Sequence, residues 1–231
     1  MDNHFFIEEP TLHELEHVEL TGQEAKHASK VLRKKEGDLV ILVNGLGCKA
    51  TAEIQSIKNK SISLSIVSAE QREEPDTKKV IGLGIIKIRD RFEFAIEKAV
   101  ELGATTICLF DAEHSERTRI KEDRIEVIVQ SAFKQSGRWW MPKLISKSDL
   151  KSVLFEFADH EMIMAHEKVD VEKPEFSSKK EKLLLVGPEG GFSDDEVKLV
   201  EQAGGHLISL GKNRLRAETA VTAILSQFLF E

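Results

Sequence analysis

The sequence predicts an α/β protein with two domains of unequal size. Across residues 80–231, strand-like apolar runs alternate with segments of helical spacing, which is the pattern of a mainly parallel sheet covered on both faces. Residues 61–66 instead alternate polar and apolar side chains, the two-residue period of half-buried antiparallel strands. Residues 70–79 (EQREEPDTKK) are polar and contain Pro75, which is typical of a linker. We therefore expect domains at 1–69 and 80–231, joined by this linker.

The first domain is predicted to be a small β-barrel or curled sheet with one helix. Apolar residues at helical spacing predict a helix over residues 22–35, which Gly37 and Asp38 end. The turns between strands are expected at Asn44-Gly45 and at residues 58–60. The strands themselves are expected at residues 39–43, 48–57 and 61–67.

The second domain is predicted to alternate five strands with five helices. Ser193 is expected to cap one helix, with Glu196 in the capping-box position. The last helix is rich in apolar residues and should be mostly buried. The strands are expected at residues 80–88, 105–110, 162–165, 183–186 and 206–210. The helices are expected at residues 91–102, 121–137, 148–156, 194–203 and 218–229.

The strongest functional signal is the stretch LLLVGPEGGFS at residues 183–193. A loop at the carboxyl end of a strand is where α/β proteins place ligands, and glycines let the backbone approach closely. Taken alone, these glycines are more often part of a plain strand-to-helix turn. Three carboxylates open the next helix and would repel a phosphate. We therefore expect a neutral or cationic small molecule at this loop.

A second loop, GKNRLRAETA at residues 211–220, follows the next predicted strand. Gly211-Lys212 resembles a P-loop superficially, but Asn213 stands where Ser or Thr is needed and the upstream glycine spacing is wrong. The sequence therefore argues against binding of a nucleoside triphosphate.

These two loops, with EKAVELG at residues 97–103 and QSGR at residues 135–138 followed by Pro142, resemble the ribosomal RNA small subunit methyltransferase E family. This family is a branch of the SPOUT methyltransferases, and the similarity covers nearly the whole chain. It implies an α/β fold with a SPOUT-type, mainly parallel sheet and a C-terminal trefoil knot, preceded by a PUA-like β-barrel domain that binds RNA. The knot comes from the resemblance alone, because folds are unknotted by default.

The resemblance implies S-adenosylmethionine bound by three loops. His166 and Glu167 could equally belong to an ordinary loop, and Glu189 has three open roles: bonding the cofactor or a loop amide, lying near the substrate, or simply being exposed. The expected cofactor-binding residues are Ala165, His166, Glu167, Gly187, Pro188, Glu189, Gly190, Gly191, Leu210, Gly211, Asn213, Leu215 and Thr219.

The implied reaction is methylation of N3 of a specific uridine near the 3′ end of 16S ribosomal RNA, in the assembled small subunit. N3 must lose its proton before its lone pair can attack, and arginine can stabilise the charge that spreads onto the uracil carbonyls. We name Arg138, Arg216 and Glu189 as catalytic candidates. Arg138 could instead be a helix C-cap cation, and Arg216 could hold Glu218 or an RNA phosphate. No His or Cys is assigned as the base.

RNA contacts are expected at two basic clusters, although the formal net charge is −7 and either cluster could be a solvated face. The expected RNA-binding residues are Lys26, Lys30, Arg33, Lys34, Arg89 and Arg91. The partners implied are 16S ribosomal RNA in the small subunit and a second copy of the chain. Arg214 carries the charge that relatives commonly place at position 213. Trp139 and Trp140 replace a more polar pair and could stack on a base, but a dimer or core contact is favoured.

Composition excludes other classes. With 41% hydrophobic and 32% charged residues, and no apolar run near about 18 residues, we expect a cytoplasmic protein without a membrane span. Cys48 and Cys108 form no ligand pattern and the eight histidines no HExxH, so we expect no metal. Two alternatives remain: a SPOUT enzyme for another RNA, and a non-catalytic RNA-binding ribosome assembly factor. The intact glycines of both loops argue against the second.

Overall fold

The computed structural model describes residues 3–58, 61–116, 120–167, 176 and 181–229. The chain divides into two compact units: residues 1–74 with 133–141, and residues 75–132 with 142–231. The second unit is therefore interrupted by nine residues that pack with the first. The sequence pattern gave no sign of this excursion, because residues 133–136 continue a helix of regular spacing.

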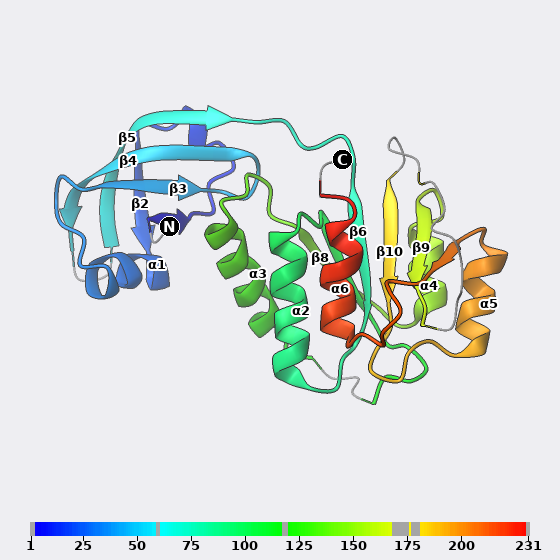
Figure 1. Ribbon diagram of the computed structural model, residues 1–231. Coiled ribbons are helices and arrows are strands. Elements are labelled where there is room, and N and C mark those ends of the chain that lie inside the picture. The colour runs from blue at the N-terminus through cyan, green and yellow to red at the C-terminus, as the bar shows by residue number, and fades with distance from the viewer. Residues whose placement is uncertain (1–2, 59–60, 117–119, 168–175, 177–180, 230–231) are drawn as a thin grey trace. The chain divides into compact units, whose positions relative to one another are not determined.

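The first unit contains a five-stranded sheet in the order β1-β3-β4-β5-β2 (Figure 1). β1 pairs in parallel with β3, and the other neighbours are antiparallel. Two register shifts between β4 and β5 mark bulges, which bend and twist a sheet and so help it to curl. The strands are β1 (His4–Phe6), β2 (His17–Thr21), β3 (Leu39–Val43), β4 (Cys48–Ile57) and β5 (Ser61–Gln71).

The helix predicted over residues 22–35 is shorter in the structure. The α-helix α1 covers Gly22–Lys26, and a π-helical turn, His27–Val31, follows it. Arg33 then takes a left-handed backbone conformation with φ of 53°, which breaks the helical path. The side chains of Ala25 and Ala28 still face the core of the unit, so the predicted apolar face is present.

Both tryptophans bind the segment 133–141 to the rest of the first unit. Lys49 Nζ lies 4.3 Å and Arg72 Cζ 3.9 Å from the ring centre of Trp139, which are cation–π contacts. Trp140 Nε1 donates a hydrogen bond of 3.0 Å to the carbonyl of Glu73. A Cβ at Gly47 would lie 2.7 Å from the Trp140 ring, so only glycine fits there. These contacts support packing within the protein as the role of the two tryptophans, and not stacking on an RNA base.

The second unit is built on a six-stranded parallel sheet in the order β11-β9-β10-β6-β7-β8. Every residue of the central strands β6, β7 and β10 is buried, as their continuous apolar sequences predict. The strands are β6 (Lys79–Gly84), β7 (Thr106–Phe110), β8 (Lys143–Lys147), β9 (Glu161–Ala165), β10 (Lys182–Val186) and β11 (His206–Ile208).

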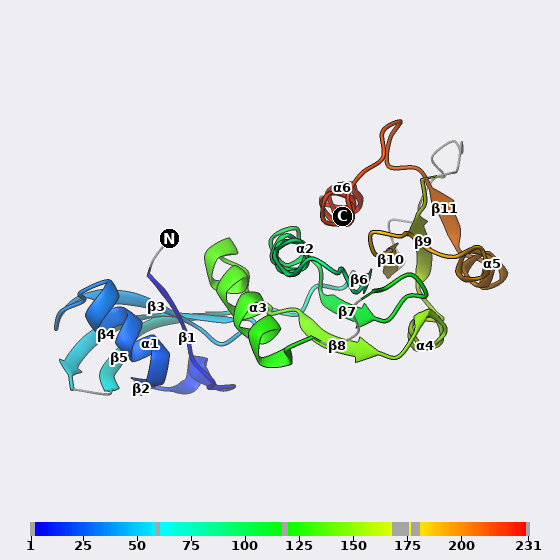
Figure 2. The same cartoon turned by 90° about the horizontal axis from the view of Figure 1, so that it is seen from below.

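Helices cover both faces of this sheet. Figures 1 and 2 show α2 and α6 side by side on one face, with α4 and α5 on the opposite face. The capping box that begins α5 is confirmed, because Ser193 Oγ accepts from Glu196 N at 3.2 Å and Glu196 Oε2 accepts from Ser193 N at 2.9 Å. The helices are α2 (Arg89–Glu101), α3 (Glu122–Ser136), α4 (Leu150–Glu156), α5 (Asp194–Gln202) and α6 (Ala217–Ser226).

The strand predicted at residues 80–88 ends earlier, at Gly84. Ile85 N still donates to Phe110 O at 3.1 Å, but residues 85–88 then leave the sheet as the loop that leads into α2. Among the described residues, no helix is long and apolar enough to cross a membrane.

Candidate active site

A cavity of about 590 Å³ opens in the second unit at the carboxyl ends of β9, β10 and β11. Small-molecule sites typically measure about 300–1,000 Å³. The cavity is bordered by three segments: residues 165–167 after β9, the glycine loop (residues 187–193) after β10, and the basic loop (residues 209–216) after β11. The strand order places these segments together, since β10 and β11 both neighbour β9.

Most of the predicted cofactor residues line this cavity. Thr219, which is exposed on α6, does not line it. Arg216 lines the cavity, whereas Arg138 belongs to the first unit. The predicted residues that line it are Ala165, His166, Glu167, Gly187, Pro188, Glu189, Gly190, Gly191, Leu210, Gly211, Asn213 and Leu215. The other lining residues, which the sequence did not single out as cofactor contacts, are Arg91, Val186, Phe192, Ser209, Lys212, Arg214, Ala217 and Ala220.

The glycine loop is a closed turn. Gly191 N donates to Pro188 O at 2.9 Å, and Gly191 has φ of 72°, a conformation that favours glycine. A Cβ at Gly187 would lie 3.1 Å from the Gly191 carbonyl carbon, so a side chain there would force the turn to shift slightly. Phe192 is buried and stacks on Phe110, with ring centres 6.5 Å apart. The conformation of the loop is therefore held by its own hydrogen bond and by packing of Phe192.

Glu189 bonds loop amides, one of the roles left open by the sequence. Its Oε2 accepts from Lys87 N at 3.0 Å and its Oε1 from Ile88 N at 3.3 Å. These amides precede the first turn of α2, so the carboxylate joins the glycine loop to the start of that helix. Among the described residues, Glu189 has no ion pair within 4 Å, and it is exposed.

A loop after β7 braces the glycine loop from a second side. His114 Nδ1 lies 3.2 Å from Gly190 O and donates a hydrogen bond to it in the tautomer that protonates this nitrogen. Glu113 N donates to Glu196 Oε1 at 3.1 Å, so the capping-box carboxylate also holds this loop. Sequence reasoning did not find His114, because it lies 76 residues from its partner.

The basic loop is open and mostly exposed. Its side-chain contacts are two hydrogen bonds and one ion pair. Ser209 Oγ donates to Gly211 O at 3.0 Å and accepts from Gly211 N at 3.4 Å, and Arg214 Nε lies 3.0 Å from Glu167 Oε2. The pair joins two of the three segments around the cavity. Arg216 is the N-cap residue of α6 and its side chain makes no capping bond.

Two buried polar atoms near the cavity have no hydrogen-bond partner among the described residues. They are His166 Nδ1 and Glu218 Oε2. The His166 amide is used, since it donates to Ile208 O at 2.9 Å. Glu218 lies on the first turn of α6, and its Oε1 is 3.6 Å from Arg91 Nε. A buried polar atom without a partner is costly, so each of these two atoms calls for a hydrogen bond from water or from a ligand.

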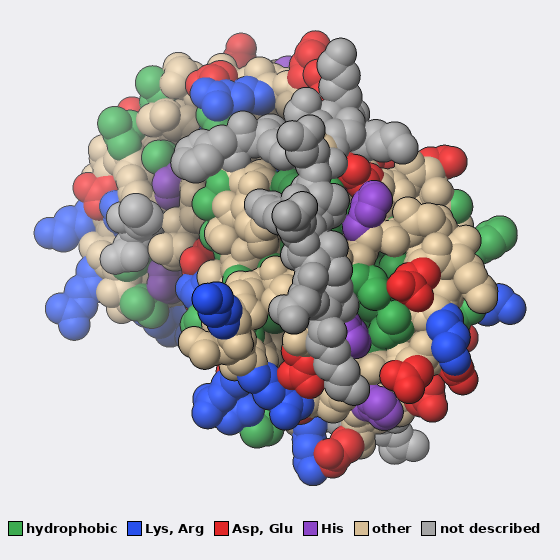
Figure 3. Space-filling model, turned by 45° about the vertical axis from the view of Figure 1, so that its right-hand side comes forward, with side chains coloured by type: hydrophobic (Ala, Val, Ile, Leu, Met, Phe, Trp, Pro, Cys, Tyr) green, Lys and Arg blue, Asp and Glu red, His purple; other side chains and the backbone are tan. Residues whose placement is uncertain are grey.

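The two predicted basic clusters differ in their surroundings. Lys26, Lys30 and Arg33 are exposed and form no ion pair with a described residue. Arg89 instead lies 3.4 Å from Glu93, and Arg91 pairs with Glu218. Figure 3 shows both signs of charge on the face it draws, with acidic side chains gathered at its lower right. The cluster in the first unit is thus the better electrostatic surface for phosphates.

Burial lowers the pKa of Arg138 to about 10, so this guanidinium remains protonated at neutral pH. Burial raises the pKa of the Cys108 thiol to about 12, which makes it an unreactive core thiol. Among the described residues, no group of three or more His, Cys, Asp or Glu side chains is placed to hold a metal ion.

Comparison with known proteins gives two matches to family models. Residues 72–229 match the RNA methyltransferase domain and residues 20–67 match the RNA methyltransferase PUA domain. The ribosomal RNA small subunit methyltransferase E of Rickettsia conorii is 32% identical, over 91% of this chain and 88% of that protein. The chain belongs to the ribosomal RNA small subunit methyltransferase E family.

Two further relatives of this family extend the match to nearly full length. The Bacillus subtilis enzyme is 29% identical, over 98% of this chain and 96% of its own. The crystal structure of the Neisseria gonorrhoeae enzyme bound to S-adenosylmethionine has a TM-score of 0.79 and 27% identity, over 97% of this chain and 95% of that chain. The fold class expected from the sequence is confirmed for the parallel sheet and the PUA-like domain.

Proposed function

We propose that this chain transfers a methyl group from S-adenosylmethionine to N3 of one uridine near the 3′ end of 16S ribosomal RNA. The observation that carries the proposal is the glycine loop, which is held by bonds within the protein and lines the cavity between the three segments. The Neisseria relative binds S-adenosylmethionine. S-adenosylmethionine, when bound, supplies a methyl group on a positively charged sulfur, which keeps the bonding electron pair as the methyl moves to N3.

The residues of the cavity fit this cofactor. The glycine loop brings backbone N–H and C=O groups to the cavity wall, and the buried His166 Nδ1 has no partner among the described residues. Leu210, Leu215 and Phe192 add apolar surface for the adenosine. Acidic and basic side chains line the edge of the cavity, and they suit the methionine part of S-adenosylmethionine, which has both an ammonium group and a carboxylate. The acidic start of α5 disfavours a phosphate here.

The chain must also favour the deprotonated base. Loss of the N3 proton spreads negative charge onto the uracil carbonyls, and a guanidinium can donate hydrogen bonds to them. The position of Arg216, which lines the cavity from the start of α6, supports this role for it. We keep Arg138 and Glu189 as catalytic candidates, Arg138 as a cation brought to the reacting base and Glu189 through its hold on the α2 loop.

The first unit is proposed to hold the RNA. Its exposed cations Lys26, Lys30 and Arg33, with the half-buried Lys34, lie within nine residues of one another in the sequence. We propose that residues 1–69 form this small domain. We also propose a dimer in which the small domain of one protomer binds the RNA that enters the cavity of its partner. The proposed substrate is the assembled small subunit in the cytoplasm. The target base must leave its stack to reach the cavity.

The deciding experiment is methyl transfer from labelled S-adenosylmethionine to small ribosomal subunits that lack this modification, followed by mass spectrometry of the product base. We expect label on N3 of a single 16S uridine. Label on another nucleotide or RNA would replace the proposed substrate. Cofactor binding without label on any ribosomal RNA would contradict it, and absence of cofactor binding would favour a non-catalytic assembly factor.

A further inference from the structure

Arg91 and Glu218 form a pair at the edge of the cavity that the proposed mechanism has not used. Arg91 lies on the first turn of α2 and lines the cavity, and Glu218 lies on the first turn of α6. Only 12% of the Glu218 side chain is exposed, whereas 31% of the Arg91 side chain is exposed. The pair therefore has a buried acidic end and a cationic end that reaches the cavity.

The pair is incompletely bonded. Arg91 Nε and Glu218 Oε1 are 3.6 Å apart, which is an ion pair but not a hydrogen bond, and Glu218 Oε2 has no partner among the described residues. A guanidinium carries five N–H donors in a planar fork, so one edge can bond a carboxylate while the other bonds a ligand. Arg91 lines the cavity, so the N–H groups that do not face Glu218 are available to a ligand there.

The backbone that carries Arg91 is held by the glycine loop. Glu189 accepts from Lys87 N and Ile88 N, the amides that precede the first turn of α2. Helices α2 and α6 also pack side by side (Figure 1). Arg91 is therefore positioned from two sides, by the loop proposed to bind the cofactor and by the carboxylate of α6.

The charge of the pair distinguishes its role from that of a phosphate contact. Arg91 is neutralised by Glu218, whereas Arg216 forms no ion pair with a described residue and is exposed. A neutralised guanidinium attracts a distant phosphate weakly, but its directed donors still stabilise a charge that develops within hydrogen-bond distance. The uracil carbonyls acquire such a charge when N3 loses its proton.

We propose that Arg91 donates hydrogen bonds to the uracil oxygen that becomes negative in the reaction, and that Glu218 is the positioning residue that aims it. The N3 proton leaves to water, the charge it leaves behind is shared by the ring oxygens, and methylation of N3 returns the ring to neutrality. The Arg91 bonds are therefore strongest while the ring is charged, which favours the reacting state over the bound substrate. This inference rests on the function proposed above.

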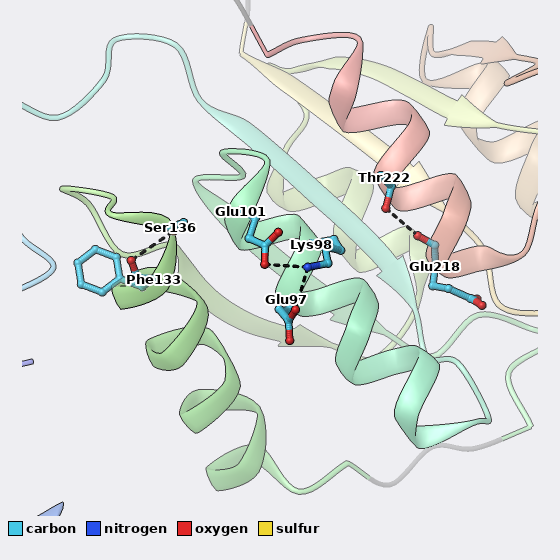
Figure 4. A network of polar contacts seen from close by, with 7 residues as sticks. All are labelled: Glu97, Lys98, Glu101, Phe133, Ser136, Glu218 and Thr222. Atoms are coloured by element: carbon cyan, nitrogen blue, oxygen red, sulfur yellow. Dashed lines mark hydrogen bonds and ion pairs between the residues drawn. The ribbon is translucent and has the colours of Figure 1, made fainter. Parts of the chain in front are cut away.

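The test uses Arg91→Lys, Glu218→Gln and the double variant in the full-length protein. Figure 4 shows the matched control: Glu97 points toward Lys98 on α2, and both are drawn apart from the Glu218 side chain on α6. Glu97→Gln removes a carboxylate that does not line the cavity. For each variant we would measure kcat, KM for small subunits, the pH profile of kcat and the affinity for S-adenosylmethionine.

We expect kcat to fall about 100-fold in Arg91→Lys and about tenfold in Glu218→Gln, by analogy with loss of one donor to a developing oxyanion. The rising limb of the pH profile should move to higher pH in both, because the anion is less stabilised. The double variant should be no slower than Arg91→Lys, since Glu218 acts through Arg91. Cofactor affinity and Glu97→Gln should match the wild type.

Three results would overturn the inference. A parallel loss of cofactor affinity would make Arg91 a cofactor contact. A raised KM with unchanged kcat would make it a phosphate contact. An additive double variant would separate Glu218 from Arg91. If Glu218→Gln does not fold, Glu218→Asp keeps the charge with a shorter reach and should show the same pH shift in smaller measure. A wild-type protein that transfers no methyl group contradicts the proposed function instead.

Discussion

The glycine loop and the basic loop border the same cavity but are held very differently. The glycine loop has a closing turn at Pro188, a bond network through Glu189 and His114, and a capping box behind it. The basic loop, in contrast, has two internal side-chain bonds, both between Ser209 and Gly211, and the exposed ion pair of Arg214. One side of the cavity is thus held by many bonds within the protein, and the other side by few.

This difference matches a division of tasks. A small ligand bound on a rigid turn loses little affinity to ordering the protein, so the glycine loop suits the cofactor. A loop with Lys212, Arg214 and Arg216 and few bonds of its own suits a polyanion whose shape the loop must follow. We therefore expect substitutions in the glycine loop to act mainly on cofactor binding, and those in the basic loop mainly on RNA.

The largest expected effect is that of Gly190→Val. A Cβ at Gly190 would lie 2.8 Å from His114 Cβ, and overpacking of this kind costs about 1–3 kcal/mol before the second branch of valine is added. Affinity for S-adenosylmethionine should fall at least about 100-fold, which corresponds to about 2.7 kcal/mol. Isothermal titration calorimetry measures the affinity, and circular dichroism should show a folded chain.

His114→Gly in the same chain provides the check on the cause. It removes the side chain that the new valine meets, so it should restore part of the lost affinity. Normal affinity in Gly190→Val alone would remove the glycine loop from the cofactor site. Absence of rescue would mean that the valine acts on the ligand directly.

Glu189→Ala should have an intermediate effect. It deletes the acceptor of two backbone N–H bonds, and hydrogen bonds to a charged group contribute about 1.5–3 kcal/mol when buried, less at an exposed site. We expect about a tenfold loss of cofactor affinity, equal to about 1.4 kcal/mol. Asp195→Ala is the matched control, because it removes an exposed carboxylate that pairs with Lys198 on α5. Equal affinities in the two variants would contradict the bracing role.

The smallest effect is expected for Arg214→Ala. Exposed ion pairs contribute about 0.2–1 kcal/mol, so loss of the bond to Glu167 should change cofactor affinity by less than about fivefold. The effect should disappear at about 1 M salt, where charges are screened beyond roughly 3 Å. Lys198→Ala, which breaks a comparable pair on α5, should leave cofactor affinity unchanged at both salt concentrations. A loss of cofactor affinity as large as that of Gly190→Val would make the two loops equivalent.

The sequence predicted the parts of the fold that carry local signals. The start of α5 was correct to the residue, because a capping box is read within four positions. The central strands were found because they are continuously apolar. The edge strands β1, β2 and β8 were missed, since β1 is three residues long and β8 mixes exposed and half-buried positions. Their pairing depends on partners far along the chain.

The same limit applies to the site. Glycine-rich loops revealed the cavity, but His114 and the Arg91–Glu218 pair depend on packing between segments separated by more than 70 residues. Trp139 and Trp140 were left open for the same reason, since their partners come from β4 and the end of β5. The trefoil knot implied by the resemblance, like the roles of Arg138 and Thr219, stays a prediction.

The contact between Lys79 and the end of α6 has a consequence for synthesis of the protein. Lys79 Nζ donates to Phe228 O at 2.6 Å, across 149 residues, and α6 supplies Ala217 and Ala220 to the cavity wall. During translation β6 is made long before Phe228. The ammonium group of Lys79, which is buried in the folded protein, therefore cannot form this bond until the residues after α6 have been made. The nascent chain therefore completes its cavity only after α6 has been made. We expect a protein with a shortened α6 to be bound by chaperones and degraded by proteases.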